Sequence, residues 1–552
     1  MNMLTRREAI ALGAASAMQA QQAVPTFDAD LVARYDKSVE DLLKRQNTSA
    51  GDRGLGCIPD DTGLYFMGTA VGIVETFASA YICPQSKYHK NPLMMERAKL
   101  AAGFLLREQL PDGNAYLPIT NFDSPPDTAF IVNGVATTAW NAKQYGNMEL
   151  FNVLEPFLRK AGAALTRGGV HTPNHRWVVC SALAQINSLF PSPAIVKRID
   201  QWLAEGIDID SDGQFTERST YNYNPIVDRS LVVVALKLNR PELLEPVRKN
   251  LNAMMYLIHA DYEAVTEISR RQDLNTRGNI AGYWFSYAHL ARIDRNGQFA
   301  AIANHFTPVA ASIASLLEYP QLREPGPAPV APPDNYEKVF PYIGVARIRR
   351  GAVSATVLEG KNRFFLLRRG EAVIGALRFA SAFFGKGQFI GTKLVQKDGG
   401  YYMAQSLTGP YYQPFNPPRK ITTETYDSTR RERAQSEVCH LEQTVFIQEN
   451  AKGFTVRIQS KGTNDVPLAI EINLREGGKL EGCEPVTKVV DGYILPKGFA
   501  GYQAGSDAIR FGPGSAPHRY TQVRGADAKL AGPSVYITGL TPFDHTLKFE
   551  WA

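Results

Sequence analysis

The chain has 552 residues, about 3.7 times a typical domain of about 150 residues, so we expect two to four domains and a large buried core. Hydrophobic residues make up 44% and charged residues 21%, which excludes a collagen-like or wholly disordered chain. The net charge of +6 is too small for a dedicated nucleic-acid-binding protein but is compatible with an anionic ligand. The five cysteines are widely spaced and form no CxxC pair, so a disulfide framework is not expected.

Residues 1–20 have the pattern of an export signal. Arg6 and Arg7 precede a small-apolar stretch over 9–18, which is too short to span a bilayer and is followed by small residues suited to cleavage. The arginine pair resembles the start of a twin-arginine signal, and an amphipathic N-terminal helix is the alternative. We therefore expect a periplasmic or secreted protein without membrane insertion.

Residues 21–318 are predicted to form a helical domain, because apolar residues recur at helical spacing between short polar loops. Helices are expected at 64–82, 92–109, 127–143, 147–163, 174–190, 228–238, 280–291 and 298–318. The loops 110–114 and 210–214 share an Asp-Gly turn, and their separation of 100 residues would equal two helix-pair repeats of about 50. This arrangement predicts an incomplete α/α toroid, a barrel of helix pairs.

Six prolines mark a linker over residues 319–336, because neither a helix interior nor a central strand accepts so many. Beyond it the apolar period changes toward two, in short segments separated by Gly, Asp and Asn turns. These segments begin at Gly344, Arg363, Thr444, Phe454, Leu468, Val535 and Leu547. Residues 337–552 are therefore predicted to form an antiparallel β-sandwich, which makes the chain multidomain, α first and β second.

A first candidate group for chemistry lies at residues 172–177. Thr172 can cap the helix that follows and Pro173 suits its first turn, which leaves Asn174 and His175 among free backbone N–H groups. The partial positive charge there favours a bound carboxylate and a neutral imidazole, which can act as a base. In the structural alternative, Asn174 assists the cap and His175 is an ordinary helix-start histidine.

A second candidate group occupies the loop 212–225. Its side chains, which include Glu217, Arg218, Tyr221 and Tyr223, are rich in proton donors and acceptors. Loops on a rigid scaffold commonly carry binding or catalytic groups. The alternative is an ordinary turn whose tyrosines pack against neighbouring helices.

These two groups resemble the pattern of the heparinase II/III-like polysaccharide lyases and their alginate-lyase relatives. In those families an Asn at a helix start, often followed by His, precedes by about fifty residues an Asp-Gly turn with Glu, Ser and Tyr shortly after it. The matching residues here are Asn174, His175, Asp212, Gly213, Glu217, Ser219 and Tyr221. These lyases join an incomplete α/α toroid to an antiparallel β-sandwich, so the resemblance implies an enzyme that cleaves an anionic, uronate-containing polysaccharide or oligosaccharide by β-elimination.

The resemblance also implies roles for individual residues. Asn174 would hydrogen-bond the substrate carboxylate, and His175 would take the C5 proton or orient the group that does. Tyr221 would protonate the leaving O4, and in a syn elimination could be both base and acid. The family often has His directly after the tyrosine, whereas this chain has Asn222, so Tyr223 is a rival for the catalytic position.

No cofactor is expected, and metal use stays open, although the sequence shows no strong cluster of metal ligands. Many heparinase-type β domains carry a His-x-His-x-Asp-like metal segment, but the corresponding residues 379–389 contain no histidine. The resemblance therefore implies no structural zinc site here.

Further substrate contacts are expected from arginines and from an earlier loop. Arg218, beside Glu217, could lower the tyrosine pKa or hold a carboxylate, and a surface ion pair of these two residues is the alternative. Arg270 and Arg277 lie in a polar loop suited to carboxylate or sulfate recognition, since guanidinium binds such oxyanions bidentately. The alternative for this loop is a solvated connection.

The loop 121–127 and the helix after it hold two more candidates for sugar contacts, Asp127 and Asn133. Prolines and an Asp cap would also explain this loop.

Two competing functions remain for the chain. One is an inverting glycoside hydrolase with carboxylates such as Asp127 and Glu217 as base and acid, and the other is a non-catalytic glycan-binding protein.

Overall fold

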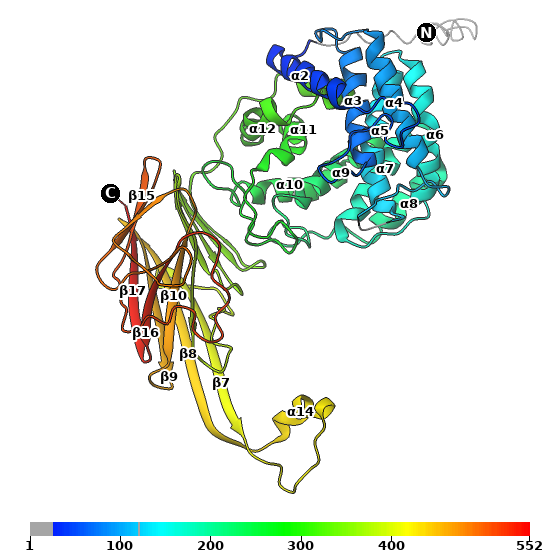
Figure 1. Ribbon diagram of the computed structural model, residues 1–552. Helices are drawn as coiled ribbons and strands as arrows, with labels where there is room; N and C mark the ends of the chain where they lie inside the picture. The colour runs from blue at the N-terminus through cyan, green and yellow to red at the C-terminus, as the bar shows by residue number, and fades with distance from the viewer. Residues whose placement is uncertain (1–25, 120–121, 552) are drawn as a thin grey trace, which may run out of the picture. The chain divides into compact units, whose positions relative to one another are not determined.

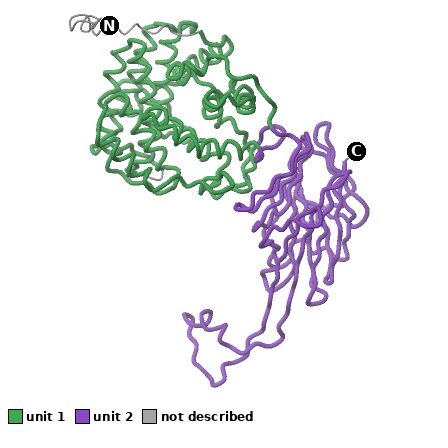
Figure 2. The backbone as a smooth tube through the Cα atoms, turned by 180° about the vertical axis from the view of Figure 1, so that it is seen from behind, with its two compact units in different colours: residues 1–255, 264–332 green, residues 256–263, 333–552 purple. Residues whose placement is uncertain are grey.

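The computed structural model describes residues 26–119 and 122–551, so the predicted export signal lies outside the described residues. The chain divides into two compact units, shown in Figure 2. Unit 1 comprises Met1–Met255 and Ala264–Pro332, and unit 2 comprises Tyr256–Glu263 and Pro333–Ala552. No helix of the described residues has the length and hydrophobicity needed to cross a bilayer.

Unit 1 is helical (Figure 1). Its α-helices are α2 (Ala29–Arg45), α3 (Met67–Ile82), α4 (Pro92–Glu108), α5 (Pro125–Gln144), α6 (Met148–Leu165), α7 (Pro173–Leu189), α8 (Pro193–Leu203), α9 (Tyr223–Leu238), α10 (Leu244–Met254), α11 (Trp284–Ile293), α12 (Gly297–Ala310) and α13 (Ile313–Glu318). Short 3₁₀ turns lie at η2 (Pro241–Leu243), η3 (Ile280–Tyr283) and η4 (Pro320–Arg323). Four α-helices begin with proline, whose missing N–H costs nothing in the first turn.

The expected helices are confirmed to within a few residues, with two differences. The helix expected at 228–238 begins at Tyr223, because Pro225 falls in its first turn, where proline is tolerated. The helix expected at 298–318 is wrong as a single element. The backbone is extended at Ala311, and Ser312 starts a new helix by accepting the N–H of Ser315 at 3.1 Å.

Five helix pairs build the toroid of unit 1. The inner helices α3, α5, α7, α9 and α11 pack against one another in chain order. The outer helices α4, α6, α8, α10 and α12 each pack against the inner helix that precedes them in the chain. The last helix, α13, packs against α3 and α5. The inner helices are therefore buried on both sides, which explains why apolar residues surround them rather than forming one stripe.

A recurrent turn marks the helix-pair repeat. In the turns that begin at Asp60, Leu110 and Asp210, the first N–H donates to the carbonyl four residues later at 2.8 to 2.9 Å. The glycine in the second of these turns, Gly113, has a φ of 103°, and a Cβ there would lie 2.3 Å from a carbonyl oxygen of α6. Only glycine allows this close approach. A fourth turn, at His259, has the same hydrogen bond, so the spacing supports a repeat of about 50 residues.

Unit 2 is a β-sandwich with a small helix. Its strands are β1 (Asn335–Phe340), β2 (Val345–Arg350), β3 (Val353–Leu358), β4 (Phe365–Arg369), β5 (Ala372–Ser381), β6 (Val395–Lys397), β7 (Gly400–Tyr412), β8 (Gln435–Asn450), β9 (Gly453–Gly462), β10 (Pro467–Leu474), β11 (Lys479–Glu481), β12 (Glu484–Pro485), β13 (Gly492–Ile494), β14 (Ala500–Ala504), β15 (Asp507–Gly512), β16 (Ser534–Leu540) and β17 (Phe543–Glu550). Helix α14 (Thr423–Thr429) lies at the far end of the β7–β8 ribbon, which extends away from the sandwich (Figure 1).

Two sheets form the sandwich. The first has the order β1-β2-β3-β4-β5-β10-β16-β13-β12, and the second has the order β11-β14-β15-β17-β9-β8-β7-β6. All pairs are antiparallel except β13 with β16. Inward side chains from both sheets, such as Ile470 of β10 and Val456 of β9, belong to one buried apolar cluster. Because side chains alternate between the two faces of each sheet, one face of each sheet is apolar, and burial of these faces in a shared core holds the two sheets together.

The segment 256–263 belongs with unit 2, although we expected it within the helical residues 21–318. Arg347 of β2 is fully buried and donates to the carbonyl oxygens of Tyr256 at 3.1 Å and Ile258 at 2.9 Å. His259 pairs with Ser354 at 2.6 Å. These bonds satisfy polar groups on a sheet face that the segment covers, which periodicity along the chain does not reveal.

Candidate functional site

Asn174 lies in the first turn of α7, where it is 1% exposed. Its side-chain amide donates to Glu217 Oε2 at 2.7 Å and to Thr172 Oγ1 at 3.2 Å, so both amide hydrogens are used. Its Oδ1 is buried and has no hydrogen-bond partner. The structure thus brings together two residues of the sequence pattern, and Thr172, which was expected to cap α7, makes no side-chain cap bond.

Glu217 also faces a cation. Its Oε1 lies 3.2 Å from Nε of Arg271, and its side chain is 7% exposed. Burial raises the pKa of the Glu217 carboxyl, while the Asn174 hydrogen bond and the Arg271 charge oppose that rise. The ion pair of this carboxylate is therefore with Arg271, one of the three arginines of the loop predicted to bind carboxylate or sulfate.

Tyr223 joins the same series of contacts from the start of α9. The guanidinium of Arg271 lies 5.1 Å from the centre of the Tyr223 ring, a cation–π distance. The Tyr223 hydroxyl accepts a hydrogen bond from Gln272. Asn174, Glu217, Arg271 and Tyr223 are thus linked by direct contacts.

Tyr221 is held through its backbone, and its side chain is 39% exposed. Its N–H donates to Asp273 Oδ2 at 3.3 Å. Its ring lies against Gly278, where a Cβ would be 2.2 Å from a ring carbon. Because Gly278 has no side chain, the Tyr221 ring can lie against its backbone.

Asp273 accepts hydrogen bonds from both loops of the site. It is 4% exposed and accepts hydrogen bonds from Ser219 Oγ at 2.9 Å and from Ser269 Oγ. Because Ser219 and Tyr221 lie in one loop and Ser269 in the other, this carboxylate sets the position of both. Sequence reasoning missed Asp273, since its partners are 52 and 54 residues away along the chain.

His175 follows Asn174 and is half-buried. Its ring lies edge-on to those of His171, at 4.7 Å, and Phe130, at 6.0 Å. The pKa of His175 is lowered to about 4, chiefly by burial and also by His171 and Arg271, while Asp127 opposes the shift. The imidazole is therefore neutral at neutral pH and able to accept a proton, as its place at a helix start predicts.

Asp127 and Asn133 are placed differently. Asp127 exchanges hydrogen bonds with the N-cap Ser124: its N–H donates to the Ser124 hydroxyl at 3.2 Å, and its carboxylate accepts from that hydroxyl. Asn133 joins α5 to α7, because its amide donates to Val178 O at 3.4 Å and its Oδ1 accepts from Ser181 at 2.7 Å. Asn133 thus lies inside the ring of helices and is not brought to the cluster around Asn174.

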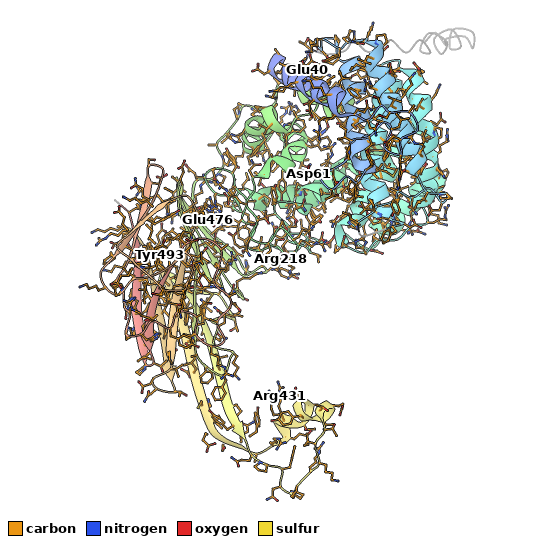
Figure 3. The ribbon with its side chains drawn as sticks, in the orientation of Figure 1. Glu40, Asp61, Arg218, Arg431, Glu476 and Tyr493 are labelled. Atoms are coloured by element: carbon orange, nitrogen blue, oxygen red, sulfur yellow. The ribbon has the colours of Figure 1, made fainter. Side chains whose placement is uncertain are left out.

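The remaining predicted arginines surround the loops. Arg218, labelled in Figure 3, has a φ of 48° in the turn after Glu217. Arg270 is exposed, and its backbone N–H donates to Glu217 O at 3.0 Å. Arg277 is exposed in the second loop.

We call the group of Asn174, His175, Glu217, Tyr221, Tyr223 and Arg271 the candidate site. In the described part of the chain, no group of three or more His, Cys, Asp or Glu residues could hold a metal ion.

Comparison with known proteins shows what this fold is similar to. No family model matches the chain, and no curated protein matches it. A xanthan lyase from Paenibacillus is 11% identical with a TM-score of 0.55, over 96% of this chain and 58% of that one. Chondroitin AC lyase from Streptomyces coelicolor, in complex with chondroitin sulphate, is 13% identical with a TM-score of 0.51, over 96% and 81%.

A heparinase III gene product is 10% identical with a TM-score of 0.50, over 92% of this chain and 81% of that one. At such identities the likeness shows the fold alone. These neighbours are α/α toroid polysaccharide lyases with β-sandwich domains. The predicted fold, an incomplete α/α toroid followed by an antiparallel β-sandwich, is confirmed.

Proposed function

We propose that this chain is an exported, periplasmic or secreted polysaccharide lyase that cleaves a uronate-containing polysaccharide or oligosaccharide by β-elimination. The observation that carries the proposal is the series of contacts from Asn174 through Glu217 and Arg271 to Tyr223, next to the neutral His175. The fold shared with solved polysaccharide lyases supports it.

The elimination sets three chemical requirements. The proton on C5 of a uronate is weakly acidic, because the neighbouring carboxylate resists further negative charge. An enzyme must therefore neutralise that carboxylate, remove the proton and protonate the departing O4. Water takes no part in the bond cleavage.

Asn174 and Arg271 meet the first requirement. The side-chain amide of Asn174 donates two hydrogen bonds, and the longer one, to Thr172 at 3.2 Å, can be replaced by a hydrogen bond to a substrate oxygen. The hydrogen bond to Glu217 then keeps the amide in place. The start of α7 adds a partial positive charge beside it, and Arg271, whose charge is paired with Glu217, has further guanidinium N–H groups that can donate to a substrate carboxylate. Exposed Arg270 and Arg277, with Arg218, would contact further carboxylate or sulfate groups.

His175 and a tyrosine meet the other two requirements. Neutral His175 would take the C5 proton or orient the group that does, and Tyr221 would protonate O4. Tyr223 competes for this role, because its hydroxyl and ring are both held, by Gln272 and Arg271. A correctly placed general acid or base is worth roughly 10²–10⁴-fold in rate.

The contacts of the carboxylates favour a lyase over a glycoside hydrolase. A hydrolase would use Asp127 and Glu217 as base and acid. Asp127 is engaged with the Ser124 cap, and Glu217 is engaged with Asn174 and Arg271.

Incubation with alginate, pectate, heparan sulfate, chondroitin, hyaluronan and xanthan tests the proposal. A lyase produces a C4=C5 double bond that absorbs ultraviolet light, without incorporating solvent oxygen. Saturated products labelled from ¹⁸O-water would show a hydrolase instead, and binding without turnover would show a glycan-binding protein. Sequencing the N-terminus of protein recovered from the periplasm or medium tests the export step.

Tyrosine variants assign the acid. We expect either Tyr221→Phe or Tyr223→Phe to lower turnover by at least roughly 10²-fold. Tyr426→Phe is the matched control, since Tyr426 lies in α14 of unit 2 with 52% exposure. Full activity of both site variants would refute the tyrosine assignment.

A further inference from the structure

A polar cavity of about 230 Å³ lies inside the ring of unit 1. It is lined by the inner helices α3, α5, α7 and α9, by the end of α12 and by α13 with the residues beside it. Nine of its twelve lining residues have polar or charged side chains. The inner helices of a packed ring would normally present apolar side chains to one another, so this composition needs an explanation.

Part of the cavity wall is fixed by hydrogen bonds. Glu318 pairs with Lys237 at 2.6 Å and accepts from Thr137 at 2.7 Å, and both members of the ion pair are at most 9% exposed. The single hydroxyl hydrogen of Thr137 can be donated to Gln185 Oε1 at 3.1 Å instead, and the Gln185 amide donates to Asn133. These groups are satisfied within the protein, and their two opposite charges cancel.

Three other polar groups that line the cavity make no such hydrogen bond or ion pair with the described residues. The guanidinium of Arg229 and the carboxyl of Glu75 make no hydrogen bond or salt bridge to described residues, although Arg229 lies 4.2 Å from the Phe285 ring centre. The hydroxyl of Tyr319, which is 6% exposed, makes no hydrogen bond of good geometry to the described residues, and burial together with the neighbouring Glu318 raises its pKa. A buried hydroxyl nearly always has a partner, and the partly exposed Arg229 and Glu75 line the same space, so these three groups point to a cavity that is occupied.

The charges around the cavity define its occupant. Burial raises the pKa of Glu75 to about 7, with Glu318 adding to the rise and Arg229 opposing it. Near neutral pH, Glu75 is therefore neutral in a large share of molecules. The Arg229 charge is then uncompensated, since Lys237 is already paired with Glu318. A single negative charge would complete the site.

The size of the cavity limits the occupant further. The cavity volume is about 230 Å³. It lies below the roughly 300–1,000 Å³ of sites for drug-sized ligands, so a polysaccharide chain is excluded.

We propose that this cavity is a binding site for one small hydroxylated carboxylic acid, of the size of a single sugar acid. Its carboxylate pairs with Arg229, and its hydroxyl groups bond to Tyr319 and Glu75. The site is separate from the candidate site, and binding there does not depend on the lyase reaction.

Isothermal titration of the full chain with sodium glucuronate, and with glucose as the neutral analogue, tests this proposal. We expect glucuronate to bind the protein, and glucose to bind at least tenfold more weakly because it cannot pair with Arg229. Absence of glucuronate binding would mean that the cavity holds only water. Equal binding of glucose would overturn the carboxylate assignment.

Variants make the test specific to the cavity. Arg229→Gln should weaken glucuronate binding at least tenfold, whereas Arg45→Gln, in an exposed ion pair of α2, should leave it unchanged. Val233→Phe, at a lining position, should block binding by filling the space if Arg229→Gln does not fold. Unchanged binding in a folded Arg229→Gln or Val233→Phe protein would refute the site.

Discussion

Replacing Glu75 by Gln should change how the stability of the protein depends on pH. Glu75 lines the polar cavity inside unit 1. The pKa of its carboxyl is raised from 4.5 to about 7, chiefly by burial. The folded state holds this proton more tightly than the unfolded state does. The stability that the protonated carboxyl contributes is therefore present below pH 4.5 and is lost as the pH rises through about 7.

The expected magnitude follows from this interval. At about 1.36 kcal/mol per pH unit, a rise of the pKa from 4.5 to about 7 corresponds to about 3 kcal/mol. The Gln variant carries no ionisable group, so its advantage over the wild type should grow by up to about 3 kcal/mol between pH 4.5 and pH 8. The ionisable and charged neighbours of Glu75 are Tyr35 of α2, Arg229 of α9, and Glu318 at the end of α13.

Urea unfolding of the two proteins at several pH values between 4.5 and 8 measures this change. Taking the difference between variant and wild type removes the contributions of titrating groups that are distant from Glu75, because these are common to both proteins. Glu96→Gln, at an exposed position of α4, is the control and should show no growing difference. A constant difference between Glu75→Gln and the wild type at all pH values would refute the argument.

Three further predictions concern the candidate site. Gly278→Ala should lower turnover with little loss of secondary structure by circular dichroism, because its Cβ would lie 2.2 Å from a carbon of the Tyr221 ring and displace it; unchanged kinetics would contradict this. Asp273→Asn, which weakens charged hydrogen bonds worth about 1.5–3 kcal/mol each, should lower both thermal stability and turnover. If His175 is the base, kcat/KM should fall as the pH drops through about 4, where the imidazole gains its proton, and an acid limb near pH 6.5 would exclude the lowered pKa.

Local sequence patterns were sufficient to predict most helices and strands. Apolar residues at helical spacing and prolines at helix starts are local signals, and α4 and α7 follow them to within a residue. The break between α12 and α13 escaped prediction, because apolar periodicity continues across Ala311 while the backbone there is extended. Helices α8 and α10 were not expected either, although they are the outer members of their pairs.

The candidate site could be predicted only in part. The short pattern around Asn174 and Glu217 identified two residues that hydrogen-bond each other across 43 positions. It did not distinguish Arg271 from its neighbours, because three arginines in one loop have the same local context. Asn133 shared the polar character of the site residues, yet its position on α5 directs it between helices.

By itself, the sequence determined the order of a helical half and a β half, the repeat of about 50 residues and a short list of chemical groups. These depend on periodicity and turn chemistry, which act over a few residues. Tertiary structure alone decided which groups meet. It placed Arg271 between Glu217 and Tyr223, assigned residues 256–263 to the β unit and placed Arg229 in the wall of a cavity. Contacts of this kind depend on packing between distant segments, because burial and partners, rather than residue type, set the charge state and reach of a side chain.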